Sequence, residues 1–268
     1  MKAYTYSEHF AELKSRLIKI VCFALAAFAI SYYKSQDIYL FLSAPLTNIL
    51  SPGDHRIIYT GLTEAFFTYL KIAAFASFIV TIPFIAYQLY KFIAPGLYKD
   101  ERKIAVCILA MAPILFWTGG IFVFYLVIPK AWHFFLSFEV KDSALPLVLE
   151  ARISEYLGLV TQLIVAFGLA FELPIIFASL TLMGIVSGTF LQRKRRLAII
   201  INFIIAGLIT PPDVLSQIAL ALPMLLLYEI SIGLCKYLEN RKHVPRVKSE
   251  GEANLIGKKN VRHQVDSQ

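Results

Sequence analysis

The apolar residues of this chain lie in long blocks that are separated by short polar segments. A transmembrane helix needs about 20 consecutive apolar residues. Six blocks are candidates for such helices: 17–33, 65–93, 104–129, 153–183, 197–209 and 214–234. The third block has no charged side chain, and we expect it to bend at Pro113 and at Gly119-Gly120. The pattern predicts an all-α, polytopic membrane protein with six transmembrane helices.

The fifth block is the shortest, and only four residues separate it from the sixth. Block 197–209 is 13 residues long, which is about 20 Å as a helix, whereas the hydrocarbon core of a bilayer is about 30 Å thick. Either spans five and six are short and thin the membrane locally, or they form a re-entrant hairpin around the connecting residues 210–213. We expect two short spans, and both arrangements leave the C-terminal tail on the same side.

Lysine and arginine residues are concentrated on one side of the predicted spans. If both termini lie inside, 20 of the 26 basic residues fall on the inner side and six on the outer side. Inner loops of membrane proteins carry such an excess, so we predict that the N-terminus and the C-terminus are both inside. This asymmetry accounts for most of the net charge of +8, which therefore gives no indication of nucleic-acid binding.

Composition supports a membrane domain followed by a polar tail. Hydrophobic residues make up 58% of the chain and charged residues 16%, and the mean hydropathy is +0.66. We assign residues 1–237 to the six-span membrane domain and residues 238–268 to a polar tail that we expect to be disordered. Because Glu8 and Glu12 precede the first apolar block, we interpret that block as a retained anchor rather than a cleaved signal peptide.

Motifs of enzymes and cofactor-binding proteins are missing from the sequence. It contains no GxxxxGK[ST] phosphate loop, no HExxH and no CxxC. The three cysteines, Cys22, Cys107 and Cys235, lie far apart in the sequence, which predicts neither a disulfide framework nor a metal site. We therefore expect no enzymatic activity and no cofactor.

Acidic residues at the predicted inner face are the first candidates for a binding site. Glu12 and Arg16 are four residues apart on an amphipathic helix that leads into the first span. Asp100 and Glu101 precede the third span at the same membrane face. These groups form either a solvated ion pair and an ordinary turn, or one acidic patch. Such a patch would suit a guanidinium, whose planar fork pairs with a carboxylate through two hydrogen bonds.

Glu172 is the second candidate because it lies inside the fourth apolar block, two residues before Pro174. A carboxylate at that depth costs about 2.5–3.5 kcal/mol on insertion scales. It is either a structural carboxyl that hydrogen-bonds to a neighbouring helix or to the Ala170 carbonyl, which Pro174 leaves without its helical donor, or a functional group. In the second case it would anchor a partner helix or relay protons.

Four segments resemble one family in order and spacing: SAPL (43–46), FIAPGLYKDER (92–102), FELP (171–174) and TPPD (210–213). The family is TatC, the multispan subunit of the twin-arginine protein translocase, and the resemblance runs from about residue 7 to residue 237. It implies a receptor that binds the signal peptides of folded precursor proteins. In that family an acidic patch at the cytoplasmic face pairs with two consecutive arginines of the signal peptide.

The resemblance assigns the signal-peptide site to residues of the inner face. Glu12 and Glu101 match the two patch glutamates, while Phe92 and Arg102 lie in the same matched loop. Lys14 departs from the pattern because it stands where the family leads us to expect arginine. A lysine there would orient the patch less rigidly than the planar guanidinium of arginine.

Three further residues match the family outside this site. Glu172 matches the intramembrane glutamate associated with the single-span partner subunits, Pro45 the proline of the first outer loop, and Asp213 the acidic residue at the start of span six. The resemblance implies TatA and TatB as single-span partners, self-association in a larger complex, and use of the proton-motive force.

The expected location is the inner, or plasma, membrane, although the sequence does not distinguish it from an organellar membrane. The main alternative function is a proton-coupled transporter of small solutes with Glu172 as its relay. We see no internal repeat of the kind common in such transporters. A third hypothesis is a structural subunit of a respiratory complex.

Overall fold

The computed structural model describes residues 6–49, 57–96, 99–139, 150–209 and 214–241. The described residues form helices and connecting turns, with one isolated bridge between Ile58 and Arg152 in place of any strand. The all-α prediction is confirmed. The chain divides into two compact units. Unit 1 comprises Met1–Glu172 and Asn202–Met224, and unit 2 comprises Leu173–Ile201 and Leu225–Gln268.

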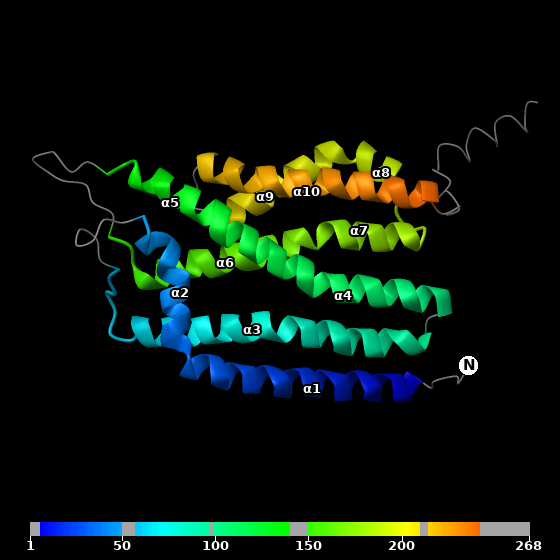
Figure 1. Cartoon of the computed structure of the whole chain (residues 1–268), viewed down its shortest axis with the longest axis horizontal. Coiled ribbons are helices and arrows are strands. Elements are labelled where there is room, and N and C mark those ends of the chain that lie inside the picture. Colours follow the sequence, from blue (N-terminus) through cyan, green and yellow to red (C-terminus); the bar gives the residue numbers. More distant parts are fainter. Residues whose placement is uncertain (1–5, 50–56, 97–98, 140–149, 210–213, 242–268) are drawn as a thin grey trace, which may run out of the picture. The chain divides into compact units, whose positions relative to one another are not determined.

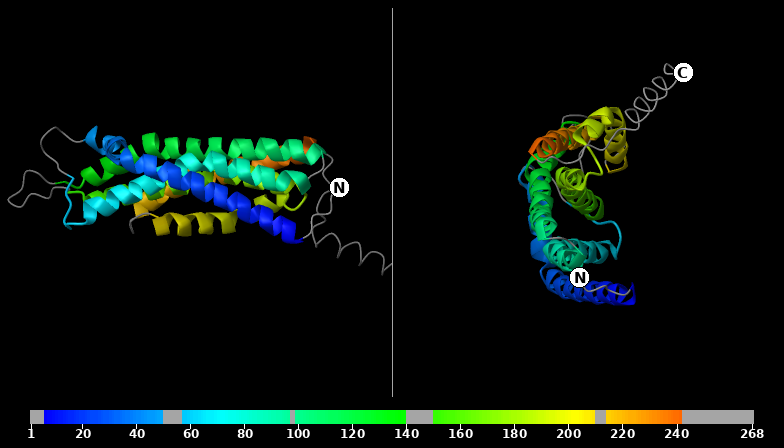
Figure 2. Two further views of the ribbon diagram at one scale, coloured as in Figure 1. Left: turned by 90° about the horizontal axis from the view of Figure 1, so that it is seen from below. Right: turned by 90° about the vertical axis from the view of Figure 1, so that its right-hand side faces the viewer.

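Unit 1 is built on four long helices that lie side by side (Figure 1). They are α1 (Tyr6–Tyr33), α3 (Glu64–Ile93), α4 (Lys99–Phe122) and α6 (Ile153–Phe171). Helix α3 packs between α1 and α4, and α4 also packs on α6. The N-terminal end of α1 lies beside the C-terminal end of α3 (Figures 1 and 2), so consecutive long helices run in opposite directions. This alternation is what repeated membrane crossing requires.

Four stretches of the described residues are long and apolar enough to cross a membrane. They are Glu64–Ile93, Ala105–Leu136, Ile153–Leu182 and Leu220–Asn240. They correspond to predicted spans two, three, four and six. The first and fifth predicted spans correspond to α1 and to α9 (Arg195–Ile209), which are not among the four stretches. The six-span prediction is consistent with these helices.

The third span contains an irregular turn that we did not predict. Helix α4 continues through Pro113, and the irregularity is a π-helical turn, η2 (Val123–Val127), followed by α5 (Ile128–Leu136). Pro129 accounts for this turn, because it has no N–H to donate to the carbonyl four residues earlier and its ring crowds that carbonyl. A continuous helix can still bend, so the bends predicted at Pro113 and at Gly119-Gly120 stay predictions, whereas the span reaches Leu136 rather than residue 129.

Gly119 and Gly120 allow α4 to pack closely on α6. A Cβ atom added to Gly119 would lie 2.6 Å from the carbonyl oxygen of Phe167, and Gly168 of α6 has the Phe116 ring equally close. Each glycine therefore faces the opposite helix at a point where no side chain fits. Small residues at such contacts are the usual means of bringing membrane helices together.

The first outer segment contains a helix that we did not predict, α2 (Ser35–Thr47), which crosses α3 (Figure 1). Pro45 lies within this helix and is buried, so it is part of the packed interior rather than of an exposed loop. The buried Tyr156 hydroxyl of α6 donates a 2.9 Å hydrogen bond to the Leu42 carbonyl of α2. Pro45 thus belongs to the outer end of unit 1, opposite the N-terminal end of α1.

Unit 2 contains α7 (Leu173–Leu182), α8 (Gly188–Arg193) and parts of α9 and α10 (Val214–Arg241). Its core is formed by Leu191, Tyr228, Ile232 and Cys235. The Tyr228 hydroxyl donates to the Leu191 carbonyl at 2.8 Å. These contacts fix α8 against the second half of α10.

Helices α9 and α10 differ in how well they match the prediction. Helix α9 has 15 residues and is short, as expected, but α10 has 28 and runs to Arg241. Helix α10 is therefore longer than predicted span six, and it continues four residues beyond the boundary that we placed at Tyr237. The rest of the predicted tail lies outside the described residues.

Candidate functional site

The inner end of unit 1 holds a guanidinium between two helices. Arg16 donates from Nε to Glu12 Oε1 at 3.1 Å, and its Nη2 donates to the same oxygen. The two residues are one helical turn apart on α1, which places their side chains on one face. Their side chains are only 17% (Arg16) and 26% (Glu12) exposed. The pair is therefore partly buried and not the solvated pair that we considered from the sequence.

Arg16 is also bonded to α3. Its Nη1 donates to Gln88 Oε1 at 3.3 Å and its Nη2 to the Lys91 carbonyl at 3.0 Å. Gln88 is 6% exposed, so its amide is packed within the protein. We call Glu12, Arg16, Gln88 and the Lys91 carbonyl the inner cluster. It joins the first turns of α1 to the last turns of α3.

The matched loop contributes a second basic group nearby. Arg102 of α4 donates from Nε to the Tyr90 hydroxyl at 3.0 Å. Gln88 and Lys91 are three residues apart and share a face of α3, whereas Tyr90 faces elsewhere. Arg102 and the inner cluster therefore lie on different faces of the last turns of α3. Phe92, at the end of that helix, is half-buried.

Two predicted site residues cannot be placed with the cluster. The backbone of Glu101 belongs to α4, but its side chain lies outside the described residues, as does Asp213. An acidic patch formed jointly by Glu12 and Glu101 stays a prediction. What the structure adds is that the Glu12 carboxylate already has a cationic partner within the chain.

Glu172 lies well away from the inner cluster. It ends α6, with its N–H bonded to the Leu169 carbonyl at 3.1 Å, and the chain resumes as α7 at Leu173. One turn earlier, Gly168 packs on Phe116 of α4. Phe116 is 14 residues from Arg102, or about 21 Å along the helix axis. Because α6 runs toward the inner end, Glu172 lies one turn nearer to it than Gly168. About 15 Å of helix therefore separate the half-buried Glu172 from the level of Arg102, which is about the hydrocarbon thickness of one leaflet.

Sequence reasoning missed the role of α3 in the site. Gln88 is the only amide side chain in block 65–93, and a buried polar group near the end of an apolar helix is a signal that could have been used. Its partner Arg16 is 72 residues away in the sequence, so no local pattern could have linked the two.

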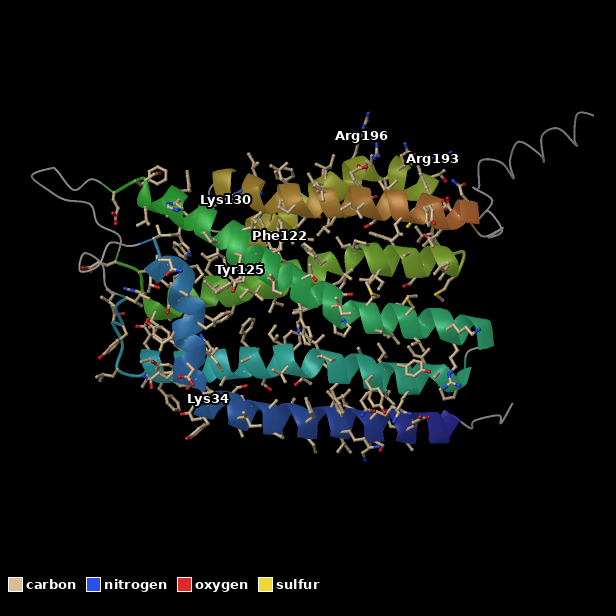
Figure 3. The ribbon with its side chains drawn as sticks, viewed as in Figure 1. Lys34, Phe122, Tyr125, Lys130, Arg193 and Arg196 are labelled. Carbon is tan, nitrogen blue, oxygen red and sulfur yellow. The ribbon has the colours of Figure 1, made fainter. Side chains whose placement is uncertain are left out.

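The inner face of unit 2 is strongly basic. Arg193 ends α8, Lys194 joins it to α9, and Arg195 and Arg196 begin α9. The side chains of Arg193 and Arg196 point away from the ribbon (Figure 3). Arg195 pairs with Glu229 at 2.6 Å. A basic segment at the start of a span agrees with the predicted inner location of this loop.

The sequence is similar to proteins of one family over most of its length. Residues 8–223 match the family model described as Sec-independent protein translocase protein (TatC). Proteins with that name from Rickettsia prowazekii (strain Madrid E) and Magnetococcus marinus are 57% and 41% identical over 239 and 236 residues. These matches cover 89% and 88% of this chain, and 95% and 85% of the respective relatives.

A solved structure has the same fold. The crystal structure described as the twin-arginine translocase receptor TatC matches with a TM-score of 0.74 at 34% sequence identity. The match covers 87% of this chain and 100% of that one.

Proposed function

We propose, since this chain belongs to the TatC family of Sec-independent protein translocase proteins, that it is the subunit that receives the signal peptides of folded precursors. As a family member it is a multi-pass inner-membrane component of a protein translocase and not an enzyme. The two alternative hypotheses, a solute transporter and a respiratory subunit, receive no support from these relatives.

One observation carries the proposal: Arg16 bonds to only one of the two oxygens of the Glu12 carboxylate. Both hydrogen bonds from Arg16 end on Oε1, and a carboxylate has about four acceptor positions on its two oxygens. Oε2 can therefore accept hydrogen bonds from an arginine of the signal peptide. The side chain is 26% exposed, which leaves it accessible while sheltering it from full solvent screening.

Neutralising Glu12 should weaken the binding of a twin-arginine peptide about tenfold. In Glu12→Gln the charge-assisted bond, worth about 1.5–3 kcal/mol, is lost, and Arg16 is left to repel the incoming cation. Glu101→Gln should act in the same direction, because it removes the second proposed carboxylate. Binding of a fluorescently labelled peptide to the purified protein in detergent measures both effects, and tenfold corresponds to about 1.4 kcal/mol.

Glu155→Gln is the matched control for these variants. Glu155 is an exposed glutamate in the first turn of α6, at the outer end of unit 1. The Glu155→Gln substitution should leave the affinity for the peptide unchanged. If Glu12→Gln and Glu101→Gln both bound the peptide as tightly as the unmodified protein, the receptor proposal would be wrong.

We further propose that single-span subunits, TatA and TatB in this family, dock beside Glu172, that the chain self-associates, and that the proton-motive force drives transport. Leu169 is exposed and one turn from Glu172 on the same helix face. A photo-crosslinker at Leu169 should capture the single-span subunits in membranes. Glu172→Leu should reduce capture about threefold, since an interhelical polar contact contributes about 0.6 kcal/mol.

A crosslinker at Leu25, an exposed residue on α1, serves as the reference position. Its capture of the same subunits should not respond to Glu172→Leu. Equal capture at Leu169 with and without the carboxyl would remove Glu172 from the partner site.

A further inference from the structure

We propose that Gln88 is a positioning residue that sets the preference of the receptor for arginine over lysine, acting through Arg16 on Glu12. This inference rests on the proposed function and concerns the selectivity of that site. It assigns a purpose to a buried amide that the family resemblance did not single out.

Arg16 is held so that it cannot leave Glu12 freely. Its bonds to Glu12 come from Nε and Nη2, and those to α3 come from Nη1 and Nη2. A planar guanidinium bonded to two helices at once has one allowed orientation. Glu12 is therefore oriented by a cation whose own position is set by α3.

Gln88 is the only side chain from α3 that holds Arg16 in the described part of the chain, because the other bond is to a backbone carbonyl. The amide oxygen must face the guanidinium, since the amide NH2 and the guanidinium are both hydrogen-bond donors and could not bond to each other. At 6% exposure the amide is packed in place. Loss of this acceptor would leave Arg16 fixed to α3 by a single backbone contact.

The fixed pair changes what Glu12 attracts. Arg16 largely neutralises the carboxylate, so an arriving cation gains little from charge alone and must gain from directed hydrogen bonds to Oε2. A guanidinium is weakly hydrated and donates from a rigid plane, whereas a lysine ammonium is compact and strongly hydrated. An arginine thus replaces its lost hydration more easily at this oxygen than a lysine does.

A Glu12 carboxylate that Arg16 no longer held in place would behave differently. It would turn toward water and present its full charge in many orientations, as exposed carboxylates do. Arginine and lysine would then bind by similar Coulomb attraction. The fixed position of Arg16 and Glu12 therefore favours selectivity for arginine more than it favours affinity for either peptide.

The test compares twin-arginine and twin-lysine versions of one labelled signal peptide, bound to the full chain in detergent. Gln88→Met keeps the length of the side chain and removes the acceptor. We expect it to lower the ratio of arginine-peptide to lysine-peptide affinity about fivefold, chiefly because lysine-peptide affinity rises. Arg16→Gln should lower the ratio at least as far, and the double variant should lower it no further than Arg16→Gln alone.

Thr81→Val is the matched control. Thr81 is a buried polar residue of α3 whose hydroxyl bonds to the Ser77 carbonyl of its own helix at 2.6 Å. The replacement disturbs the packing of the same helix without touching Arg16, and it should leave the ratio unchanged.

A parallel fall in both affinities in Gln88→Met would mean that the amide only supports the fold, and the inference would be wrong. Additive effects of Gln88→Met and Arg16→Gln would overturn it as well, because they would show that Gln88 does not act through Arg16. Failure of the receptor proposal itself is distinguishable. It would appear as no arginine preference in the unmodified protein and no effect of Glu12→Gln.

Discussion

Replacing Gly119 by alanine is expected to destabilise the protein by about 2–3 kcal/mol, whereas the same change at Gly158 should be neutral or stabilising. The new Cβ at Gly119 would lie 2.6 Å from the Phe167 carbonyl oxygen and 3.0 Å from the Phe171 ring. The nearer obstacle is backbone, so α4 and α6 must move apart. Unfolding by titration with SDS in mixed micelles measures the difference in free energy.

Gly158 provides the matched control because it is also a helical glycine of unit 1. A Cβ atom there meets nothing within 4 Å, and alanine has a higher helix propensity than glycine by about 1 kcal/mol. If Gly119→Ala unfolded at the same SDS fraction as the unmodified protein, the α4–α6 contact could not be as close as described.

Removing the Tyr156 side chain should have the largest effect of all, about 3–5 kcal/mol for Tyr156→Ala. The ring is 2% exposed and stacks on Trp132 with the centroids 5.1 Å apart. Its loss leaves a void that the packed helices cannot fill. The hydroxyl accounts for part of the effect, since Tyr156→Phe leaves the buried Leu42 carbonyl without this donor and should cost about 1–2 kcal/mol.

Tyr125 is the control residue for the two Tyr156 variants. It lies on the exposed side of η2, with 65% of its surface accessible. Tyr125→Phe should change the unfolding free energy by less than about 0.5 kcal/mol. The SDS titration used for Gly119 also measures this series. Equal stability of Tyr156→Phe and the unmodified protein would show that the bond to α2 contributes nothing.

The long helices could be predicted from the sequence because hydropathy acts locally. Blocks 65–93 and 153–183 became helices within one residue of their predicted bounds. The helices of blocks 104–129 and 214–234 continue seven residues further than predicted. Helix α2 was missed because we treated the segment after the first span as a loop, and Pro45 favoured that interpretation. Its buried residues Leu42 and Leu46 are four positions apart, which is a helical pattern that could have been noticed.

The site was only partly predictable. The i,i+4 spacing of Glu12 and Arg16 indicated an ion pair, which the structure contains. The roles that the matched motifs gave Phe92 and Arg102 stay predictions. The bond from Arg16 to Gln88 depends on how α1 packs against α3, and no periodicity within either helix contains that information. The π-helical turn was missed for a related reason, because Pro129 indicates a disturbance without specifying its form.

The Glu12–Arg16 pair has a consequence for the rate at which cargo is captured. Residues 12–16 and 91–103 together contain six basic and three acidic residues, and the one acid whose side chain is described is already paired. A cationic peptide is therefore not drawn in from a distance by this face, and electrostatic steering cannot raise its association rate. Encounters must begin with the apolar part of the peptide partitioning into the membrane. The lifetime of the complex, and not the speed of its formation, then separates cargo from other cationic chains.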